Sequence, residues 1–112
     1  MSLYSVIIPV YNEEAVICES YRRLKAVMDT LAEPYELIFI NDGSQDKTAQ
    51  IIEALARKDP SIRLLSFSRN FGHQIAITAG MDYARGQAVI IIDADLQDPP
   101  EVIPAMVAKW RE

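Results

Sequence analysis

Apolar and polar positions follow two alternating patterns along the chain. Four stretches are rich in β-branched and apolar residues, and most of them are almost continuously apolar, as strands covered on both faces are: Tyr4–Val10, Tyr35–Ile40, Ile62–Phe67 and Ala88–Ile92. Between them, apolar residues recur every three or four positions, which predicts helices over Glu14–Leu31, from Thr48 to Asp59-Pro60, over Gln74–Ala84 and from Pro99-Pro100 to Trp110. This alternation predicts an α/β fold in which a parallel sheet of about four strands is flanked by helices.

Composition narrows the class of protein. The chain has 112 residues, 50% of them hydrophobic and 24% charged, which predicts one folded domain over residues 1–112. The formal net charge of −5, without any cluster of Lys and Arg, argues against nucleic acid as a partner. Cys18 is the only cysteine, which excludes an internal disulfide and favours a cytoplasmic location. Apolar runs such as Ala88–Ile92 are far shorter than the roughly 20 residues of a membrane-spanning helix.

Polar residues follow each predicted strand directly. The clusters are Tyr11-Asn12-Glu13, Asn41-Asp42-Gly43-Ser44, Arg69-Asn70 with Gly72, and Asp93-Ala94-Asp95. The carboxyl ends of parallel strands lie at one edge of a sheet, where helix amino termini with free backbone N–H groups converge. Ligands of open parallel sheets bind at this edge. The pattern therefore predicts a binding site there, without naming the ligand.

Asp93 and Asp95 are the strongest candidates for chemistry. They are two residues apart at the end of a strongly apolar strand, so both carboxylates can point to one side of the sheet. Two adjacent carboxylates are costly unless a cation neutralises them, and their hard oxygen atoms suit Mg²⁺ or Mn²⁺, which in turn bridges ligand phosphates. Gln97 could supply a third oxygen. The alternative is a solvated turn that leads into the helix after Pro99-Pro100, but the strand context favours a metal site.

Three further side chains are candidates for binding a nucleotide, and each has a structural alternative. Asp42 could accept hydrogen bonds from a base or a ribose, with Ser44 or Asp46 left to cap the next helix, or the whole turn could serve as a cap. Glu13 could bind in the same way or only complement the dipole of the helix that follows it. Arg69 could pair with a diphosphate or form a surface ion pair.

Four segments at successive strand ends form a series that spans nearly the whole chain. They are Val6-Ile7-Ile8-Pro9-Val10-Tyr11-Asn12-Glu13-Glu14, Asn41-Asp42-Gly43-Ser44 with Asp46 and Thr48, Arg69-Asn70-Phe71-Gly72, and Asp93-Ala94-Asp95-Leu96-Gln97-Asp98-Pro99-Pro100-Glu101. Together they look like family 2 glycosyltransferases of the GT-A fold. They most resemble the polyprenyl-phosphate branch, which includes dolichyl-phosphate mannose synthases and bacterial undecaprenyl-phosphate glycosyltransferases. Each motif alone is weak, but four motifs in order are specific.

The resemblance implies a Rossmann-like GT-A domain and a reaction. A sugar would move, with inversion at its anomeric carbon, from a UDP- or GDP-linked donor to a polyprenyl phosphate. The implied site residues are Pro9, Tyr11, Glu13 and Asp42 for the base and ribose, and Asp93, Asp95 and Gln97 for Mg²⁺ or Mn²⁺ and the diphosphate. A lipid-phosphate acceptor also implies that the full-length enzyme associates with the cytoplasmic face of the membrane.

The resemblance also implies a truncated domain, because relatives continue beyond the metal motif with acceptor-site segments. We therefore expect the acceptor-side residues to lie beyond Glu112, and we assign no catalytic residue within this chain. The chain should hold the donor-binding parts and, by itself, transfer little sugar. Exposed apolar patches would favour a homo-oligomer.

Two other functions are alternatives to this one. A non-catalytic α/β module that binds a nucleotide is a serious alternative for a chain of this length. A haloacid-dehalogenase-like phosphatase is a weaker alternative, because Gln97 stands where that class has Thr or Val.

Overall fold

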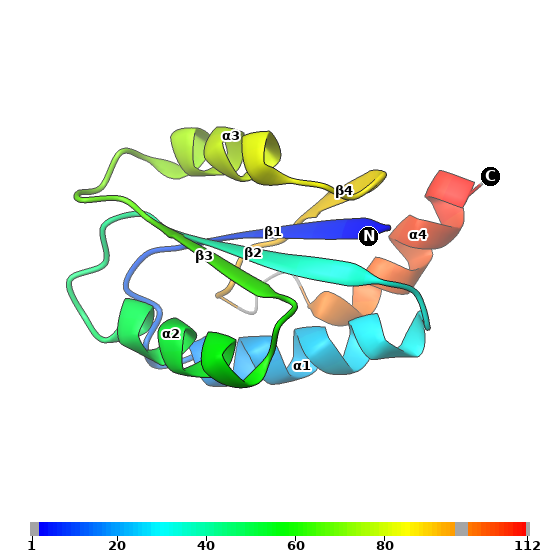
Figure 1. The fold of residues 1–112 in the computed structure, drawn as a ribbon, viewed down its shortest axis with the longest axis horizontal. Coiled ribbons are helices and arrows are strands. Elements are labelled where there is room, and N and C mark those ends of the chain that lie inside the picture. Colours follow the sequence, from blue (N-terminus) through cyan, green and yellow to red (C-terminus); the bar gives the residue numbers. More distant parts are fainter. Residues whose placement is uncertain (1–2, 96–98, 112) are drawn as a thin grey trace.

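The chain folds into a four-stranded parallel sheet with helices on both faces (Figure 1). The computed structural model describes residues 3–95 and 99–111. In chain order the elements are β1 (Tyr4–Val10), α1 (Ile17–Thr30), β2 (Tyr35–Asn41), α2 (Thr48–Lys58), β3 (Ile62–Ser66), α3 (His73–Tyr83), β4 (Ala88–Ile91), the 3₁₀ helix η1 (Pro100–Val102) and α4 (Ile103–Arg111). The expected α/β class is confirmed, and every strand boundary lies within one residue of its prediction.

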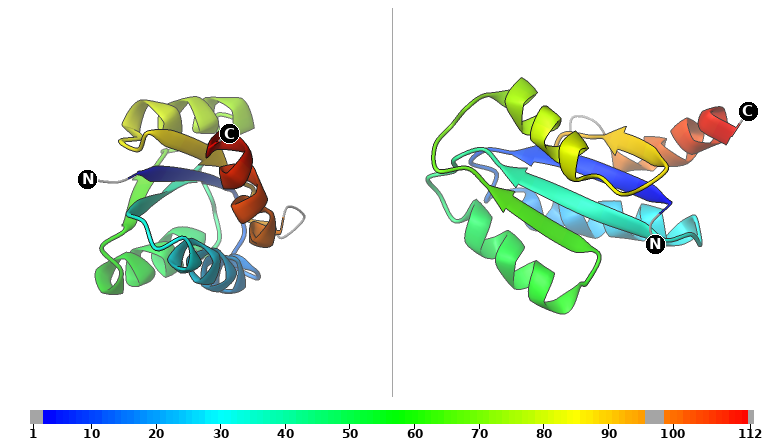
Figure 2. Two further views of the ribbon diagram at one scale, coloured as in Figure 1. Left: turned by 90° about the vertical axis from the view of Figure 1, so that its right-hand side faces the viewer. Right: turned by 45° about the horizontal axis from the view of Figure 1, so that its top comes forward.

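The sheet is built outward from β1. The strand order is β3-β2-β1-β4, so β1 pairs with β2 on one side and with β4 on the other, both in parallel. All seven residues of β1 are buried, which explains its nearly continuous apolar sequence. Helices α1 and α2 cover one face of the sheet and α3 covers the other (Figure 2). All four strands therefore end at the same edge, on the left in Figure 1.

Neighbouring residues of β1 enter two different cores. Val6 and Ile8 belong to the larger core with residues of α1 and α2, whereas Ile7 packs with Ala76 of α3. The small residues of α3 let this helix approach closely, because a Cβ atom at Gly80 would lie 2.6 Å from Ile7 Cγ2. This helix therefore packs closely on the sheet.

The first helix begins later than its periodicity predicts. Helical periodicity extends back to Glu14, but α1 begins at Ile17. The carbonyl of Glu13 accepts the amides of both Val16 and Ile17, so the segment before α1 is a turn. The Glu14 amide donates instead to Asp46 Oδ2 at 3.1 Å, a partner 32 residues away that no local pattern reveals.

The apolar stripe predicted near the end of the chain is only partly buried. Ile103 and Val107 pack in the core, but three other stripe residues and two residues of β4 are between 42% and 48% exposed: Val89, Ile91, Val102, Met106 and Trp110. Within the described ranges, β4 has a strand partner on one side only. The expected homo-oligomer stays a prediction, and this apolar surface is where we expect its contacts.

An ion pair between the buried Glu36 and the half-buried Arg63 lies at the amino-terminal edge of the sheet, opposite the polar clusters. Glu36 accepts hydrogen bonds from Ser5 Oγ at 2.6 Å, from the Arg85 amide at 2.7 Å and from the Arg63 guanidinium at 2.8 Å. Burial by itself raises the pKa of Glu36, but these hydrogen bonds outweigh it, and the pKa lies below its ordinary value. The carboxylate ties β1, β2, β3 and the segment before β4 together.

We predict that Glu36→Gln destabilises the chain by about 2–3 kcal/mol at pH 7, because the hydrogen bonds lose their charged acceptor and the glutamine nitrogen cannot accept. Because the folded pKa is lowered, the carboxylate stabilises the fold above the ordinary Glu pKa of 4.5 and this contribution is lost as the pH falls through the folded value. Urea unfolding at several pH values measures the difference. The exposed Glu53→Gln is the control; a wild-type advantage that stays constant down to acidic pH would contradict the assignment.

Candidate functional site

A pocket of about 300 Å³ opens at the carboxyl edge of the sheet. Residues from the ends of all four strands line it. Those expected from the sequence are Pro9, Tyr11, Glu13, Asp42, Asp93 and Asp95, and the others are Val10, Asn70, Gly72 and His73. This volume lies at the lower end of the roughly 300–1,000 Å³ usual for small-molecule sites. The polar clusters that are separate in the sequence thus meet in one cavity.

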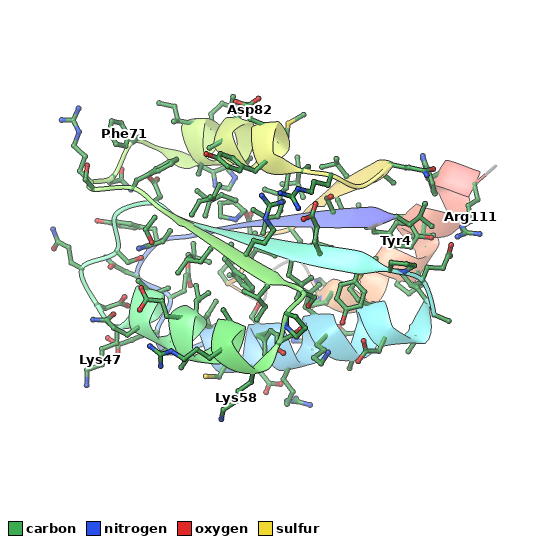
Figure 3. All side chains as sticks on the ribbon, in the orientation of Figure 1. Tyr4, Lys47, Lys58, Phe71, Asp82 and Arg111 are labelled. Carbon is green, nitrogen blue, oxygen red and sulfur yellow. The ribbon has the colours of Figure 1, made fainter. Side chains whose placement is uncertain are left out.

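Figure 3 labels side chains at both ends of the sheet. Phe71, in the loop between β3 and α3, lies at the end where the strands finish. Tyr4 and Arg111 lie at the other end, where the Arg111 guanidinium donates to the Tyr4 hydroxyl at 2.7 Å. The pocket is therefore remote from the contact that anchors the end of α4.

Asp42 is buried in the wall of the pocket and holds the β3–α3 loop. Its carboxylate accepts the Phe71 amide at 2.7 Å, the Gly72 amide at 3.0 Å and the Asn70 side-chain amide at 3.1 Å. A carboxylate offers about four acceptor positions, so about one position is left for a ligand. The free carboxylate expected from the sequence is thus largely occupied by the protein itself.

The turn after β2 requires a glycine. Gly43 has a φ of 76°, in the left-handed region, and a Cβ atom there would lie 2.3 Å from the Arg69 carbonyl carbon. This close approach brings the ends of β2 and β3 together, so that Asp42 can reach the loop that follows β3.

Neither residue that the sequence suggested is the N-cap of α2, which is Lys47 and makes no side-chain capping hydrogen bond. Asp46 Oδ1 accepts the Thr48 amide at 2.9 Å, but Asp46 precedes the N-cap residue, so this contact is a local turn just before the helix. Ser44 Oγ instead accepts the amide of Asn12 at 2.9 Å, from the loop after β1. Ser44 therefore joins two loops and does not cap.

Negative charge is concentrated around Glu13. The pKa of Glu13 is raised above its ordinary value, first by burial and then by the charges of Asp95, Asp46 and Asp93. His73 Nε2 lies 3.5 Å from Asp93 Oδ1 and is a polar neighbour of this group. The pocket thus holds carboxylates that repel one another, and a bound cation would relieve this repulsion.

Asp93 and Asp95 supply two of the oxygen-bearing side chains expected at a metal site. Both line the pocket, as their spacing predicts. Gln97, the expected third ligand, lies outside the described residues. Among the residues that the structure describes, no group of three or more His, Cys, Asp and Glu side chains is placed to hold an ion. The two carboxylates fit Mg²⁺ or Mn²⁺ in chemical type, and the remaining ligands would come from Gln97, phosphate or water.

Arg69 takes a position that the sequence did not suggest. Its guanidinium lies 4.6 Å from the centre of the Phe71 ring, a cation–π contact, and Arg69 is not among the residues that line the pocket. Pairing of Arg69 with a diphosphate stays a prediction, and it would require the side chain to leave Phe71.

Four lining residues were not among the candidates chosen from the sequence: Val10, Asn70, Gly72 and His73. Asn70 and Gly72 belong to the third polar cluster, and the contact of Asn70 with Asp42 could be inferred only from the adjacency of β2 and β3. His73 begins α3 at the pocket. Val10 reads as an ordinary strand residue, and nothing in the pattern marks it as part of a site.

The acceptor side of the site is not tested by this structure. Glu112, the residue beyond which the acceptor-side residues were expected, lies outside the described residues, which end at Arg111. The placement of acceptor-side residues beyond Glu112 therefore stays a prediction, and so does the absence of a catalytic residue from residues 1–112.

Comparison with known proteins identifies the family. Residues 5–112 match the sequence family described as glycosyl transferase family 2. The chain belongs to this family. The resemblance seen in its motifs is thereby confirmed, and the phosphatase alternative is excluded.

The relatives include one glycosyltransferase from a bacterium and one from a phage. An uncharacterised glycosyltransferase of Bacillus subtilis is 61% identical over 109 residues, covering 97% of this chain and 34% of the relative. A bactoprenol glucosyl transferase of Shigella phage SfV is 50% identical over 107 residues, covering 96% of this chain and 35% of the relative. This family 2 chain therefore spans about a third of the length of these relatives.

A solved structure shares the fold. The mannosyltransferase PcManGT from Pyrobaculum calidifontis, solved in complex with GDP-Man and Mn²⁺, superimposes with a TM-score of 0.79 at 24% identity, covering 95% of this chain and 31% of that one. The GT-A fold of the family 2 chain is thereby confirmed. Within the described residues, none of its helices is long and apolar enough to cross a bilayer.

We predict that Glu13→Gln raises the melting temperature of the metal-free chain by about 2–4 °C, the shift expected for roughly 0.5 kcal/mol. The reason is that the folded pKa is raised, so the charged carboxylate lowers stability once the pH exceeds the ordinary value of 4.5. The gain should shrink in high salt and below pH 4.5, as differential scanning calorimetry would show.

The matched control is Glu14→Gln, which removes the same charge from the next residue, an exposed one that does not line the pocket. Equal stabilisation by both substitutions would mean that only the net charge of the chain matters. It would contradict a specific repulsion between Glu13 and its neighbouring carboxylates.

Proposed function

We propose that residues 1–112 form the donor-binding part of an inverting glycosyltransferase that uses a UDP- or GDP-linked sugar. The observation that carries this proposal is the single pocket in which Asp93 and Asp95 meet Glu13 and Asp42. Family 2 membership supplies the reaction class, and the pocket supplies a place where a nucleoside diphosphate and a cation fit together.

The base and ribose would lie along the ends of β1 and β2. Tyr11 is 43% exposed and lines the pocket beside Pro9, so its ring offers an apolar surface for a base. Glu13 would accept hydrogen bonds from ribose hydroxyls. The acceptor position that remains on Asp42 suits one N–H group of the base, while its other positions keep the β3–α3 loop in place.

The diphosphate would lie beside Asp93, with Asp95 and Gln97 completing the protein ligands of Mg²⁺ or Mn²⁺. A bound cation would neutralise these carboxylates and stabilise the charge that grows on the departing diphosphate. The mannosyltransferase of the same fold contains Mn²⁺ and GDP-Man, which supports this choice of cation and ligand. Arg69 would add a second positive charge if it turned from Phe71 toward the phosphates.

A polyprenyl phosphate is the acceptor that best fits the relatives, because one of them is a bactoprenol glucosyl transferase. An acceptor phosphate is already ionised at neutral pH, so it needs no general base, whereas a hydroxyl acceptor would. The full-length protein would meet this lipid at the cytoplasmic face of the membrane. We assign no catalytic residue within residues 1–112, and we place the acceptor-side residues beyond Glu112.

A nucleotide-binding role without catalysis is the second candidate. The observation that favours it is that Glu13, Asp42, Asp93 and Asp95, which line the pocket, all suit a nucleotide and its cation. Both candidates share the same pocket and the same ligand, and they differ in whether sugar is transferred.

We predict that UDP or GDP stabilises the chain only together with Mn²⁺, and that NAD does not. At a ligand concentration of about 100 times Kd the stabilisation would be about 2.7 kcal/mol, a shift of roughly 10 °C or more in a thermal-shift assay. Asp95→Ala should abolish the shift, because the cation loses a ligand and the diphosphate then meets uncompensated carboxylates.

The matched control is Asp82→Ala on α3, an exposed carboxylate that does not line the pocket and lies away from the strand ends in Figure 3. Equal stabilisation by NAD, or a full shift retained by Asp95→Ala, would contradict the proposed donor site.

A further inference from the structure

Three successive backbone amides after β1 donate to side chains at the start of α2. The contacts are Asn12 N to Ser44 Oγ at 2.9 Å, Glu13 N to Thr48 Oγ1 at 2.8 Å and Glu14 N to Asp46 Oδ2 at 3.1 Å. A fourth contact runs in the opposite direction, from the Gln45 amide to Asn12 Oδ1 at 2.8 Å. Two loops that are about 30 residues apart in the sequence are thus joined at four points.

Helix capping does not explain this arrangement. A capping side chain accepts an amide of its own helix, but the N-cap residue of α2, Lys47, makes no such hydrogen bond. Asp46 Oδ1 accepts the Thr48 amide from a position before the N-cap. The hydroxyls of Ser44 and Thr48 accept amides of the other loop. Asn12 has a φ of 52°, in the left-handed region, so these contacts also hold a backbone conformation that few residues adopt readily.

Thr48 is the central member of this group. It is fully buried, its hydroxyl donates to Asp46 Oδ1 at 2.5 Å, and the same oxygen accepts the Glu13 amide. A hydroxyl is required because the oxygen both donates and accepts. Valine has the same shape without this oxygen, and it would leave the Glu13 amide without its partner.

Glu13 connects these contacts between the two loops to the pocket. Its amide is held by Thr48, and its carboxylate lines the pocket with Asp93 and Asp95. Tyr11, which also lines the pocket, lies directly before Asn12. A binding group that is held to within about 0.5 Å keeps its affinity, whereas a loop free to move loses part of it to ordering.

We propose that Ser44, Asp46 and Thr48 are positioning residues of the donor site, which aim the Glu13 carboxylate into the pocket by holding the three amides after β1. This role rests on the proposed function, since it concerns the same nucleoside diphosphate. These three residues are not among those that line the pocket, so they act through the loop that carries Glu13.

The chain contains a matched control at the other end of α2. Asp59 Oδ1 accepts the Ser61 amide at 3.0 Å and the Ser61 hydroxyl at 2.7 Å, the same pair of contacts that Asp46 makes with Thr48. Neither Asp59 nor Ser61 lines the pocket. Ser61→Ala therefore removes a comparable local hydrogen bond without touching the loop after β1.

The test compares Thr48→Val, Thr48→Ser and Ser61→Ala in two measurements, well below the melting temperature of each variant. Calorimetric titration with UDP or GDP in Mn²⁺ should show affinity about tenfold or more weaker in Thr48→Val and within about twofold of wild type in the other two. Amide hydrogen exchange at Glu13 and Glu14 should be faster only in Thr48→Val.

Ser44→Ala is a second variant for the case in which Thr48→Val does not fold, and it should weaken binding about threefold with faster exchange at Asn12. Wild-type affinity in Thr48→Val, or equal weakening in Ser61→Ala, would overturn the positioning role alone. A wild-type chain that binds neither nucleotide would overturn the proposed function, and the positioning role with it.

Discussion

Parallel pairing on both sides of β1 is the constraint on which the rest of the molecule depends. β1 is buried along its whole length, matches β2 in register over all seven of its residues and matches β4 over four. Because the strands all run the same way, every loop that leaves a strand does so at one edge. Residues as distant in sequence as Tyr11 and Asp95 must therefore share a pocket, whatever the detail of the loops between them.

This constraint has an electrostatic cost. Glu13, Asp93 and Asp95 meet in a space of about 300 Å³ in a chain whose formal net charge is already −5. The pKa of Glu13 is raised, first by burial and then by the charges of Asp95, Asp46 and Asp93. At the opposite edge, Glu36 is buried beside Arg63 with its hydrogen bonds satisfied, and its pKa is lowered. The ion pair at the amino-terminal edge thus stabilises the fold, whereas the carboxylates at the carboxyl edge suit a cation and its anionic ligand.

The sequence predicted the strands and the edge of the site well, because both depend on periodicity and strand direction alone. It could not predict contacts between distant loops. The start of α1 was placed too early because the Glu14 amide pairs with Asp46, and the carboxylate of Asp42 was expected to be free although it holds Gly72. The cation–π contact of Arg69 with Phe71 was not expected either, and the pairing of Arg69 with a diphosphate stays a prediction. Periodicity reports which side of an element is covered, and it carries no information on which partner satisfies a polar group.

The most direct test of this account is anomalous diffraction at the manganese absorption edge, from crystals of the chain grown with Mn²⁺ and UDP or GDP. The account predicts one strong peak in the pocket, within coordination distance of Asp93 or Asp95 and of the diphosphate oxygens. A nucleotide seated in the pocket without manganese beside these carboxylates, or manganese bound elsewhere on the molecule, would contradict it.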